Sequence, residues 1–221
     1  MKIFIPIKGH SARVNRKNFR TFGNWPLYKR CLYKFNKYDI WVDTDSDEII
    51  EGIKNDSSCS HVTVYKRDKN LVGDDVSVNW LIENFIDVAE LSDEDDVCQI
   101  HVTSPFLKPE TIETAYNMMS INSHKCIVGC NVYQSRFWKE TWNGSGYEPI
   151  NHNPKELLKT QDLPLLYEEN SAFYMFTVKE FFKRMNRISD NPHFFEVSFP
   201  ENMDIDDEED WKMAVALEKV L

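Results

Sequence analysis

The chain has 221 residues, of which 42% are hydrophobic and 28% are charged. A chain of this size and composition buries a core without disulfide or metal support. Its formal net charge of −10 argues against a general binder of nucleic acid or of an anionic membrane surface. No apolar run in the sequence approaches the ~20 residues of a membrane-spanning helix. We therefore expect neither a nucleic-acid partner nor a membrane association.

The cysteines and the start of the chain indicate a cytoplasmic location. The five cysteines include no Cys-x-x-Cys pair, which favours reduced thiols over a disulfide or zinc framework. The apolar run that follows Lys2 is too short for a signal peptide. We therefore expect free thiols in a cytoplasmic protein.

The chain begins with a strand signal and continues with alternating strand and helix signals. Residues 3–7 form a continuous apolar run, which is typical of a strand buried on both faces of a parallel sheet. Further strands are expected at 40–42, 61–65, 97–102, 125–130, 172–176 and 194–199. Helices are expected at 26–35, 76–91 and 208–221. Another helix is expected from a cap at Asp45 or Ser46 to 54. One more helix should begin near 109, and a separate one should follow the strand 172–176 and end near 186. This alternation predicts an α/β fold with a doubly wound, mostly parallel sheet.

The segment 131–169 interrupts this alternation. It is rich in aromatic residues, and Asn143-Gly144 is a strong hairpin signal. We predict an α/β domain made of residues 1–130 and 170–221, with residues 131–169 inserted as a protruding β-hairpin. An exposed aromatic hairpin is suited to a dimer contact.

Ligands of doubly wound sheets bind outside the carboxyl ends of the strands, and one loop there is basic. Residues 1–38 hold ten Lys or Arg and no Asp or Glu. The loop 8–18, KGHSARVNRKN, combines small residues with several of these cations, which suits a phosphate site. It contains neither GxxxxGK[ST] nor GxGxxG, so it is not a P-loop or a dinucleotide fingerprint. From these residues alone, a basic surface loop is an equal alternative.

Two aspartates near the other end of the chain could hold a hard cation. Asp204 and Asp206 are alternate residues, so they point the same way in an extended segment. Mg²⁺ prefers such carboxylate oxygens and keeps several of its waters. The alternative is an acidic helix N-terminus stabilised by the helix dipole, and we assign that role to the acids at 207–210.

A third candidate is the segment His101-Val102-Thr103-Ser104 at a strand end. Its hydroxyls could bind a sugar or a phosphate, or Thr103 or Ser104 could cap the following helix. The sequence contains no GxSxG motif and no recognisable nucleophile paired with a His. A cation and a basic loop without a nucleophile favour direct in-line displacement at phosphorus.

Several separated segments, taken in order, resemble the nonulosonate cytidylyltransferases, which form the CMP-sialic acid synthetase (acylneuraminate cytidylyltransferase) family. These segments are IPIKGHSARVNRKNFRTFGNWPLY, WVDTDSDEI, QIHVTSPFLKPETI, ENSAFYMF and NMDIDDEEDW. The resemblance implies a Rossmann-like nucleotidyltransferase fold that dimerises through a protruding element. It also implies a Mg²⁺-dependent transfer of CMP from CTP to the anomeric hydroxyl of a nonulosonic acid of sialic or legionaminic type, with release of pyrophosphate.

The resemblance assigns roles to individual positions. It implies catalytic and phosphate roles for Lys17 and metal ligation by Asp204 and Asp206. It implies nucleotide contacts from Lys8, Ser11, Arg13, Asn18 and Arg67. It implies sugar contacts from His101, Thr103, Ser104, Gln161 and Asn170.

Three positions depart from the family pattern. Lys8 replaces an Arg, so a bidentate contact becomes a point charge. Ala12 replaces a basic residue, and Arg13 supplies one a position later, as in the related 3-deoxy-manno-octulosonate (KDO) cytidylyltransferases. His101 replaces a Gln in the sugar pocket. The alternatives are therefore KDO activation, another nucleotidyltransferase, or a non-catalytic binder of sugar or nucleotide.

Overall fold

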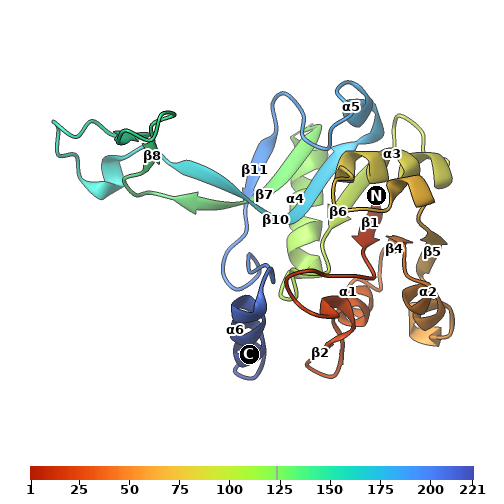
Figure 1. Ribbon diagram of the computed structural model, residues 1–221. Helices are drawn as coiled ribbons and strands as arrows, with labels where there is room; N and C mark the ends of the chain where they lie inside the picture. Colours follow the sequence, from red (N-terminus) through yellow and green to blue (C-terminus); the bar gives the residue numbers. More distant parts are fainter. Residues whose placement is uncertain (123) are drawn as a thin grey trace.

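A computed structural model describes residues 1–122 and 124–221 and places one seven-stranded sheet at the centre of the molecule (Figure 1). The strands of this sheet are β1 (Lys2–Ile7), β4 (Asp39–Thr44), β5 (Val62–Lys66), β6 (Asp96–Ile100), β7 (Cys126–Tyr133), β10 (Leu166–Thr177) and β11 (His193–Glu196). Their spatial order is β11-β7-β10-β6-β1-β4-β5. Strand β10 is antiparallel to both of its neighbours, and the other adjacent pairs are parallel.

Strand β1 lies inside the sheet, hydrogen-bonded to β4 on one side and to β6 on the other. Its side chains alternate between two hydrophobic clusters, with Ile3 and Ile5 in one and Phe4 in the other, and all three are fully buried. The sequence predicted a strand buried on both faces here, and this prediction is confirmed.

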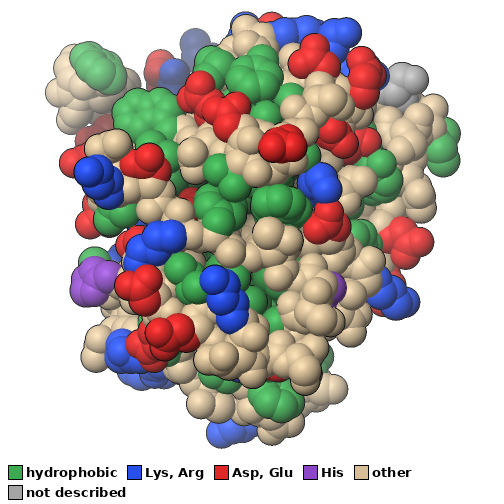
Figure 2. Space-filling model, turned by 90° about the vertical axis from the view of Figure 1, so that its right-hand side faces the viewer, with side chains coloured by type: hydrophobic (Ala, Val, Ile, Leu, Met, Phe, Trp, Pro, Cys, Tyr) green, Lys and Arg blue, Asp and Glu red, His purple; other side chains and the backbone are tan. Residues whose placement is uncertain are grey.

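Helices cover both faces of the sheet, as a doubly wound fold requires. The helices are α1 (Leu27–Lys34), α2 (Asp47–Lys54), α3 (Val78–Val88), α4 (Pro109–Ile121), α5 (Val178–Phe182) and α6 (Glu208–Glu218). Buried residues of α1, α2, α4 and α6 join the cluster of Ile3 and Ile5, whereas those of α3 and α5 join the cluster of Phe4. The predicted fold class is therefore confirmed. On the face that Figure 2 presents, acidic and basic side chains lie interspersed with apolar ones.

An arm extends away from the sheet at the ends of β7 and β10 (Figure 1). These strands remain paired out to Tyr133 and Leu166, and beyond them β8 (Trp138–Glu140) pairs with β9 (Tyr147–Pro149). The predicted hairpin at Asn143-Gly144 is present, and Gly144 adopts a positive φ of 66° in its turn. Both long strands run through the predicted domain boundaries without a linker, and the division into domains stays a prediction.

The structure differs from the predicted elements at several places, and strand β11 ends at Glu196 rather than at 199. Residues 8–25, expected to be loop, contain a small hairpin of β2 (Thr21–Phe22) and β3 (Trp25–Pro26). The sequence did not predict this hairpin, because strands of two residues carry no hydrophobic period. Strands β7 and β10 are longer than predicted, since both continue from the sheet into the arm, where their residues are mostly half-buried or exposed. Helix α5 ends at Phe182 rather than near 186. In the described part of the chain, no helix is both long enough and apolar enough to cross a bilayer.

Packing of α3 on the sheet depends on Phe85, whose ring is fully buried and stacks on Phe4 with centroids 4.5 Å apart. Replacing Phe85 with Ala leaves a cavity between helix and sheet, so we expect a loss of about 3–5 kcal/mol in the free energy of unfolding. Urea denaturation measures this loss. The control is Trp80→Ala on the same helix, where the side chain is 54% exposed and the expected change is within about 0.5 kcal/mol. Equal losses in the two variants would contradict this packing.

Candidate active site

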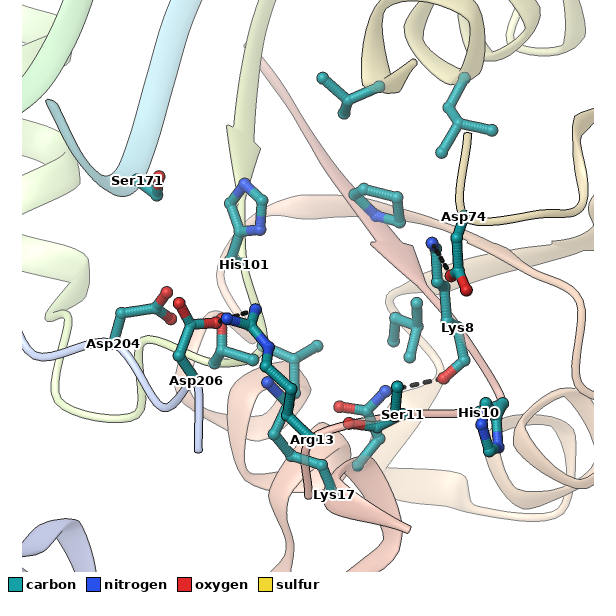
Figure 3. A pocket seen from close by; sticks show the side chains of 18 of the residues that line it. Lys8, His10, Ser11, Arg13, Lys17, Asp74, His101, Ser171, Asp204 and Asp206 are labelled. Carbon is teal, nitrogen blue, oxygen red and sulfur yellow. Dashed lines mark hydrogen bonds and ion pairs between the residues drawn. The ribbon is translucent and has the colours of Figure 1, made fainter. Parts of the chain in front are cut away.

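A cavity of about 540 Å³ opens at the carboxyl end of β1, where the sequence predicted ligand-binding loops (Figure 3). Its wall is formed by the end of β1, the loop 8–18, the segment 67–81, the residues after β6, Ser171 on β10, and the segment before α6. The predicted site residues that line it are Lys8, Ser11, Arg13, Lys17, Asn18, Arg67, His101, Thr103, Asp204 and Asp206. The topology thus brings together residues from both ends of the chain.

The loop 8–18 is fixed against the carboxyl end of β4. The backbone N–H of Gly9 donates to Oδ1 of Asp45 at 2.6 Å. A Cβ at Gly9 would lie 2.8 Å from Cβ of Ser46, so this approach requires glycine. Asn18 closes the loop by donating from Nδ2 to the carbonyl of Lys8 at 2.8 Å. The basic loop is therefore an ordered wall of the cavity.

Two cations of this loop face the segment before α6. The ammonium of Lys17 is buried and donates to the carbonyl of Ile205 at 2.6 Å. Loss of hydration lowers the pKa of Lys17, although Asp204 and Asp206 oppose this effect. Nη2 of Arg13 lies 2.7 Å from Oδ1 of Asp206, and both side chains are largely exposed. The loop thus contributes one buried and one exposed positive charge at this end of the cavity.

The two aspartates share one face of an extended segment, as predicted. Between them, Ile205 is fully buried, and its N–H donates to the carbonyl of Thr103 at 2.9 Å. Oδ1 of Asp204 is buried and has no hydrogen-bond partner among the described residues. Burial raises the pKa of Asp204, and the nearby charge of Asp206 adds to this rise.

An unsatisfied buried carboxylate oxygen beside a second carboxylate fits a hard divalent cation. The part of the chain that the structure describes has no cluster of three or more His, Cys, Asp or Glu with metal-ligand geometry. Asp204 and Asp206 would therefore hold such an ion by two protein ligands. Water and substrate oxygens supply the remaining ligands of an ion bound in this way. The acids behind them form a capping box, in which Asp207 and Asp210 satisfy the first turn of α6.

Arg67 lies on the opposite wall in a buried ion pair. Its Nε donates to Oδ2 of Asp43 at 2.9 Å, and both side chains are 1% exposed. Burial raises the pKa of Asp43 to about 6, against the opposing effect of Arg67. Nη1 of Arg67 is buried without a partner in the described chain. Arg67 thus forms part of the cavity wall while one of its N–H groups is left without a partner among the described residues.

Several lining residues near Arg67 were missed by the sequence reasoning. Nζ of Lys8 lies 3.0 Å from Oδ1 of Asp74 and donates to the carbonyl of Gly73 at 3.2 Å. Val76, Val78 and Leu81 add an apolar surface to this wall. In the loop after β5, the family resemblance pointed to Arg67 alone. The three apolar residues carried only a helical period, which gives no sign of a ligand.

His101 and Thr103 line the end of the cavity next to Ser171. The pKa of His101 is lowered to about 4, mainly by burial and in part by the charges of Arg187 and Lys17. The imidazole is therefore neutral near pH 7. Figure 3 shows its ring between Ser171 and Lys8, above Asp206 and Arg13.

Three residues predicted to contact the sugar lie outside the cavity wall. Ser104 is buried, and its Oγ has no partner among the described residues. Asn170 donates from Nδ2 to Oδ1 of Asn131 at 3.2 Å and accepts from the N–H of Ala172 at 3.1 Å. Gln161 lies exposed in a short 3₁₀ helix, Thr160–Asp162, within the arm. The structure therefore places Ser104 and Asn170 behind the wall and Gln161 on the arm.

Comparisons with known proteins agree with this architecture. A family model described as "Cytidylyltransferase" matches residues 3–219. The chain is 26% identical to a pseudaminic acid cytidylyltransferase of Campylobacter jejuni, over 98% of this chain and 95% of the relative. It is also 26% identical to N-acylneuraminate cytidylyltransferase A of Danio rerio, over 94% of this chain and 48% of the relative.

A solved structure supports the fold. The CTP complex of CMP:2-keto-3-deoxy-manno-octonic acid synthetase superposes with a TM-score of 0.65 at 14% identity. The superposition covers 99% of this chain and 98% of that one. Because the family model spans nearly the whole sequence, the chain belongs to the cytidylyltransferase family.

Proposed function

We propose that this protein transfers CMP from CTP to the anomeric hydroxyl of a nonulosonic acid and releases pyrophosphate. The observation that carries the proposal is the meeting of Arg13 and Lys17 with Asp204 and Asp206 across one cavity. Such a pairing of fixed cations with metal-binding carboxylates is what a triphosphate and its cation require. The relatives named above act, by their names, on pseudaminic acid and N-acylneuraminate.

The wall around Arg67 suits the nucleoside of CTP. Val76, Val78 and Leu81 offer apolar surface to a flat base, and the free Nη1 of Arg67 offers a buried donor. A buried donor discriminates between ligands, because a base without a matching acceptor leaves it unpaired. The ion pair with Asp43 holds Arg67 in place for this contact.

The opposite wall suits the phosphates. Lys17 and Arg13 contact phosphate oxygens, and Lys8 adds a third charge from the other side of the cavity. Asp204 and Asp206 hold Mg²⁺, which when bound polarises phosphoryl oxygens as a Lewis acid. When the nucleotide binds, Arg13 leaves Asp206 and contacts a phosphate. Breaking the Arg13–Asp206 pair costs little free energy, because both side chains are exposed.

The reaction is a single displacement at the α-phosphorus. The anomeric oxygen of the sugar acid forms a bond to this phosphorus and loses its proton to water. The bond from the phosphorus to the bridging oxygen of the β-phosphate breaks, and that oxygen leaves with pyrophosphate. Positioning and charge stabilisation by the cavity residues suffice for this step. We place the reaction in the cytoplasm, where CTP is made and where the five buried, free cysteines stay reduced.

The remaining end of the cavity is assigned to the sugar acid. His101 and Thr103 line it, and Ser171 adds a hydroxyl that the sequence reasoning missed. Asn170 precedes Ser171 and fixes the backbone there through its bond to Ala172. Ser104 is buried behind the cavity wall and Gln161 is exposed on the arm, so a sugar acid bound in this cavity contacts neither of them within one chain.

The substrate is tested by incubating the protein with CTP, Mg²⁺ and, in turn, N-acetylneuraminic, legionaminic and pseudaminic acids and KDO. We expect pyrophosphate release with at least one of the three nonulosonic acids, measured by a coupled phosphate assay. Turnover of KDO alone would assign the protein to KDO activation. Absence of pyrophosphate with all four acids would identify a non-catalytic homologue.

The proposed metal ligands are tested by Asp204→Asn and Asp206→Asn. Each change removes a negative charge from the cation site, so we expect kcat to fall by about 100-fold or more. The melting temperature should stay close to that of the unaltered protein. The control is Glu209→Gln, an exposed carboxylate on α6, which should keep full activity. Full activity in Asp206→Asn would remove this residue from the site.

The arm supports a homodimer as part of the proposal. Its exposed apolar side chains include Trp142, which is fully exposed, and Leu157, which is 91% exposed. Exposed apolar side chains that gather on one arm indicate a contact surface. A homodimer joined through the arms would cover them.

The dimer is tested by the double variant Trp142→Ser/Leu157→Glu. A charge placed in an apolar contact destabilises association, so we expect a monomer by light scattering after size-exclusion chromatography. The control is Val220→Glu, which is 78% exposed and lies beyond α6, away from the arm. An unchanged oligomeric state in the double variant would contradict the role of the arm.

A further inference from the structure

A partly buried chain of polar side chains runs behind His101, and none of the roles above uses it. Gln99 precedes His101 by two residues on β6 and is fully buried. Its Nε2 lies 2.7 Å from Nε2 of His101. On the other side, Nη1 of Arg187 donates to Oε1 of Gln99 at 2.6 Å. The three side chains thus form one continuous hydrogen-bonded chain that ends at the cavity.

The chemistry of this chain fixes the direction of every hydrogen bond. A guanidinium only donates, so the amide oxygen of Gln99 must face Arg187. The amide nitrogen of Gln99 therefore faces His101, and it can only donate. Nε2 of His101 must then be the accepting, unprotonated nitrogen. In a neutral imidazole this leaves the proton on Nδ1.

Arg187 is held firmly enough to impose this direction. Its guanidinium lies over the ring of Tyr174, with Cζ 3.5 Å from the ring centroid. Its backbone N–H donates to Oδ1 of Asn79 at 3.2 Å, and its carbonyl accepts from Sγ of Cys126 at 3.4 Å. These contacts come from β10, α3 and β7, so the orientation of Arg187 is set by the packed core.

The charges around His101 keep the ring neutral. Arg187 and Lys17 are the charged groups that lower its pKa, in addition to burial. Nδ1 has no hydrogen-bond partner within the described chain, and the ring lines the cavity. The Nδ1–H group is therefore the one that a ligand meets.

We propose that Gln99 and Arg187 are positioning residues that hold His101 as its neutral Nδ1–H tautomer, so that His101 gives one fixed donor to an acceptor oxygen of the sugar acid. The identity of the ligand rests on the proposed function. The carboxylate and the carbonyl groups of such an acid are acceptors of this kind. His101 is then unable to act as a general base on the anomeric hydroxyl, because Gln99 already occupies its only lone pair.

The tautomer is measured directly in the unaltered protein by NMR with ¹⁵N-labelled histidine. His101 is assigned by the signal that disappears in His101→Asn. At pH 7 we expect a protonated-type shift at Nδ1 and an unprotonated-type shift at Nε2. A proton on Nε2, or on both nitrogens, would overturn the proposal. This experiment uses neither CTP nor sugar acid, and the one variant that it needs, His101→Asn, serves only to assign the signal.

Two variants test the roles of the positioning residues. In Gln99→Glu, a carboxylate accepts from both neighbours, so the proton should appear on Nε2 of His101. In Arg187→Met, the Gln99 amide is free to rotate, so both tautomers should be populated. The control is Arg184→Met on the same segment, where Arg184 is exposed and pairs with Asp190. If His101 kept the Nδ1–H tautomer unchanged in both Gln99→Glu and Arg187→Met, the proposal would be overturned.

Kinetics test the consequence for the sugar acid. Loss of one donor to a charged acceptor weakens binding by about tenfold or more, so the KM for the sugar acid should rise by that factor in Gln99→Glu, where Nδ1 of His101 loses its proton. The KM for CTP should stay within about twofold, because the nucleotide wall is untouched. Equal increases in both KM values would reduce Gln99 to a structural residue. If no acid turns over but the Nδ1–H tautomer is found, the proposed function fails while the assignment of the tautomer stands.

Discussion

The site depends on one buried contact, the hydrogen bond from Nζ of Lys17 to the carbonyl of Ile205. The two residues are 188 positions apart, and this contact places the basic loop beside the aspartates. A buried ammonium is stabilised only where polar atoms surround it. The carbonyl of Ile205 and the nearby charges of Asp204 and Asp206 provide this surrounding, so the loop and the acidic segment hold each other in place.

The order of the strands makes this contact possible. Because β1 and β6 are adjacent and parallel, the loop 8–18 and the residues after β6 leave the same edge of the sheet. The segment before α6 joins that edge through the hydrogen bond from Ile205 to Thr103. Residues from three distant parts of the sequence therefore meet without any long structureless loop. The same edge is where ligands bind in other doubly wound sheets.

The sequence was sufficient for features that rest on local patterns and on strand ends. The buried run 3–7, the alternation at Asp204 and Asp206, and the turn at Asn143-Gly144 each follow from a short period or a turn preference. Features that depend on side chains packed from distant elements were not predictable in this way. Arg187 reaches Gln99 across 88 positions, and nothing in the segment that begins at Gln99 indicates Arg187 as its partner. The placement of Asn170 behind the wall likewise follows from a local interruption of β10, at which Ser171 has a positive φ.

The charged contacts of the cavity divide into two kinds, and this division matches what each end must do. Arg13 with Asp206 and Lys8 with Asp74 are exposed pairs, which are worth little and separate easily. Arg67 with Asp43 is buried, and Gln99, the partner of the half-buried Arg187, is fully buried, so separating either pair would leave an unpaired polar group in the core. Under the proposed function, the phosphate end can therefore exchange its partners when a triphosphate and a cation enter. The ends proposed for the base and the sugar acid stay preorganised, so discrimination between substrates would reside in the parts of the cavity that do not rearrange.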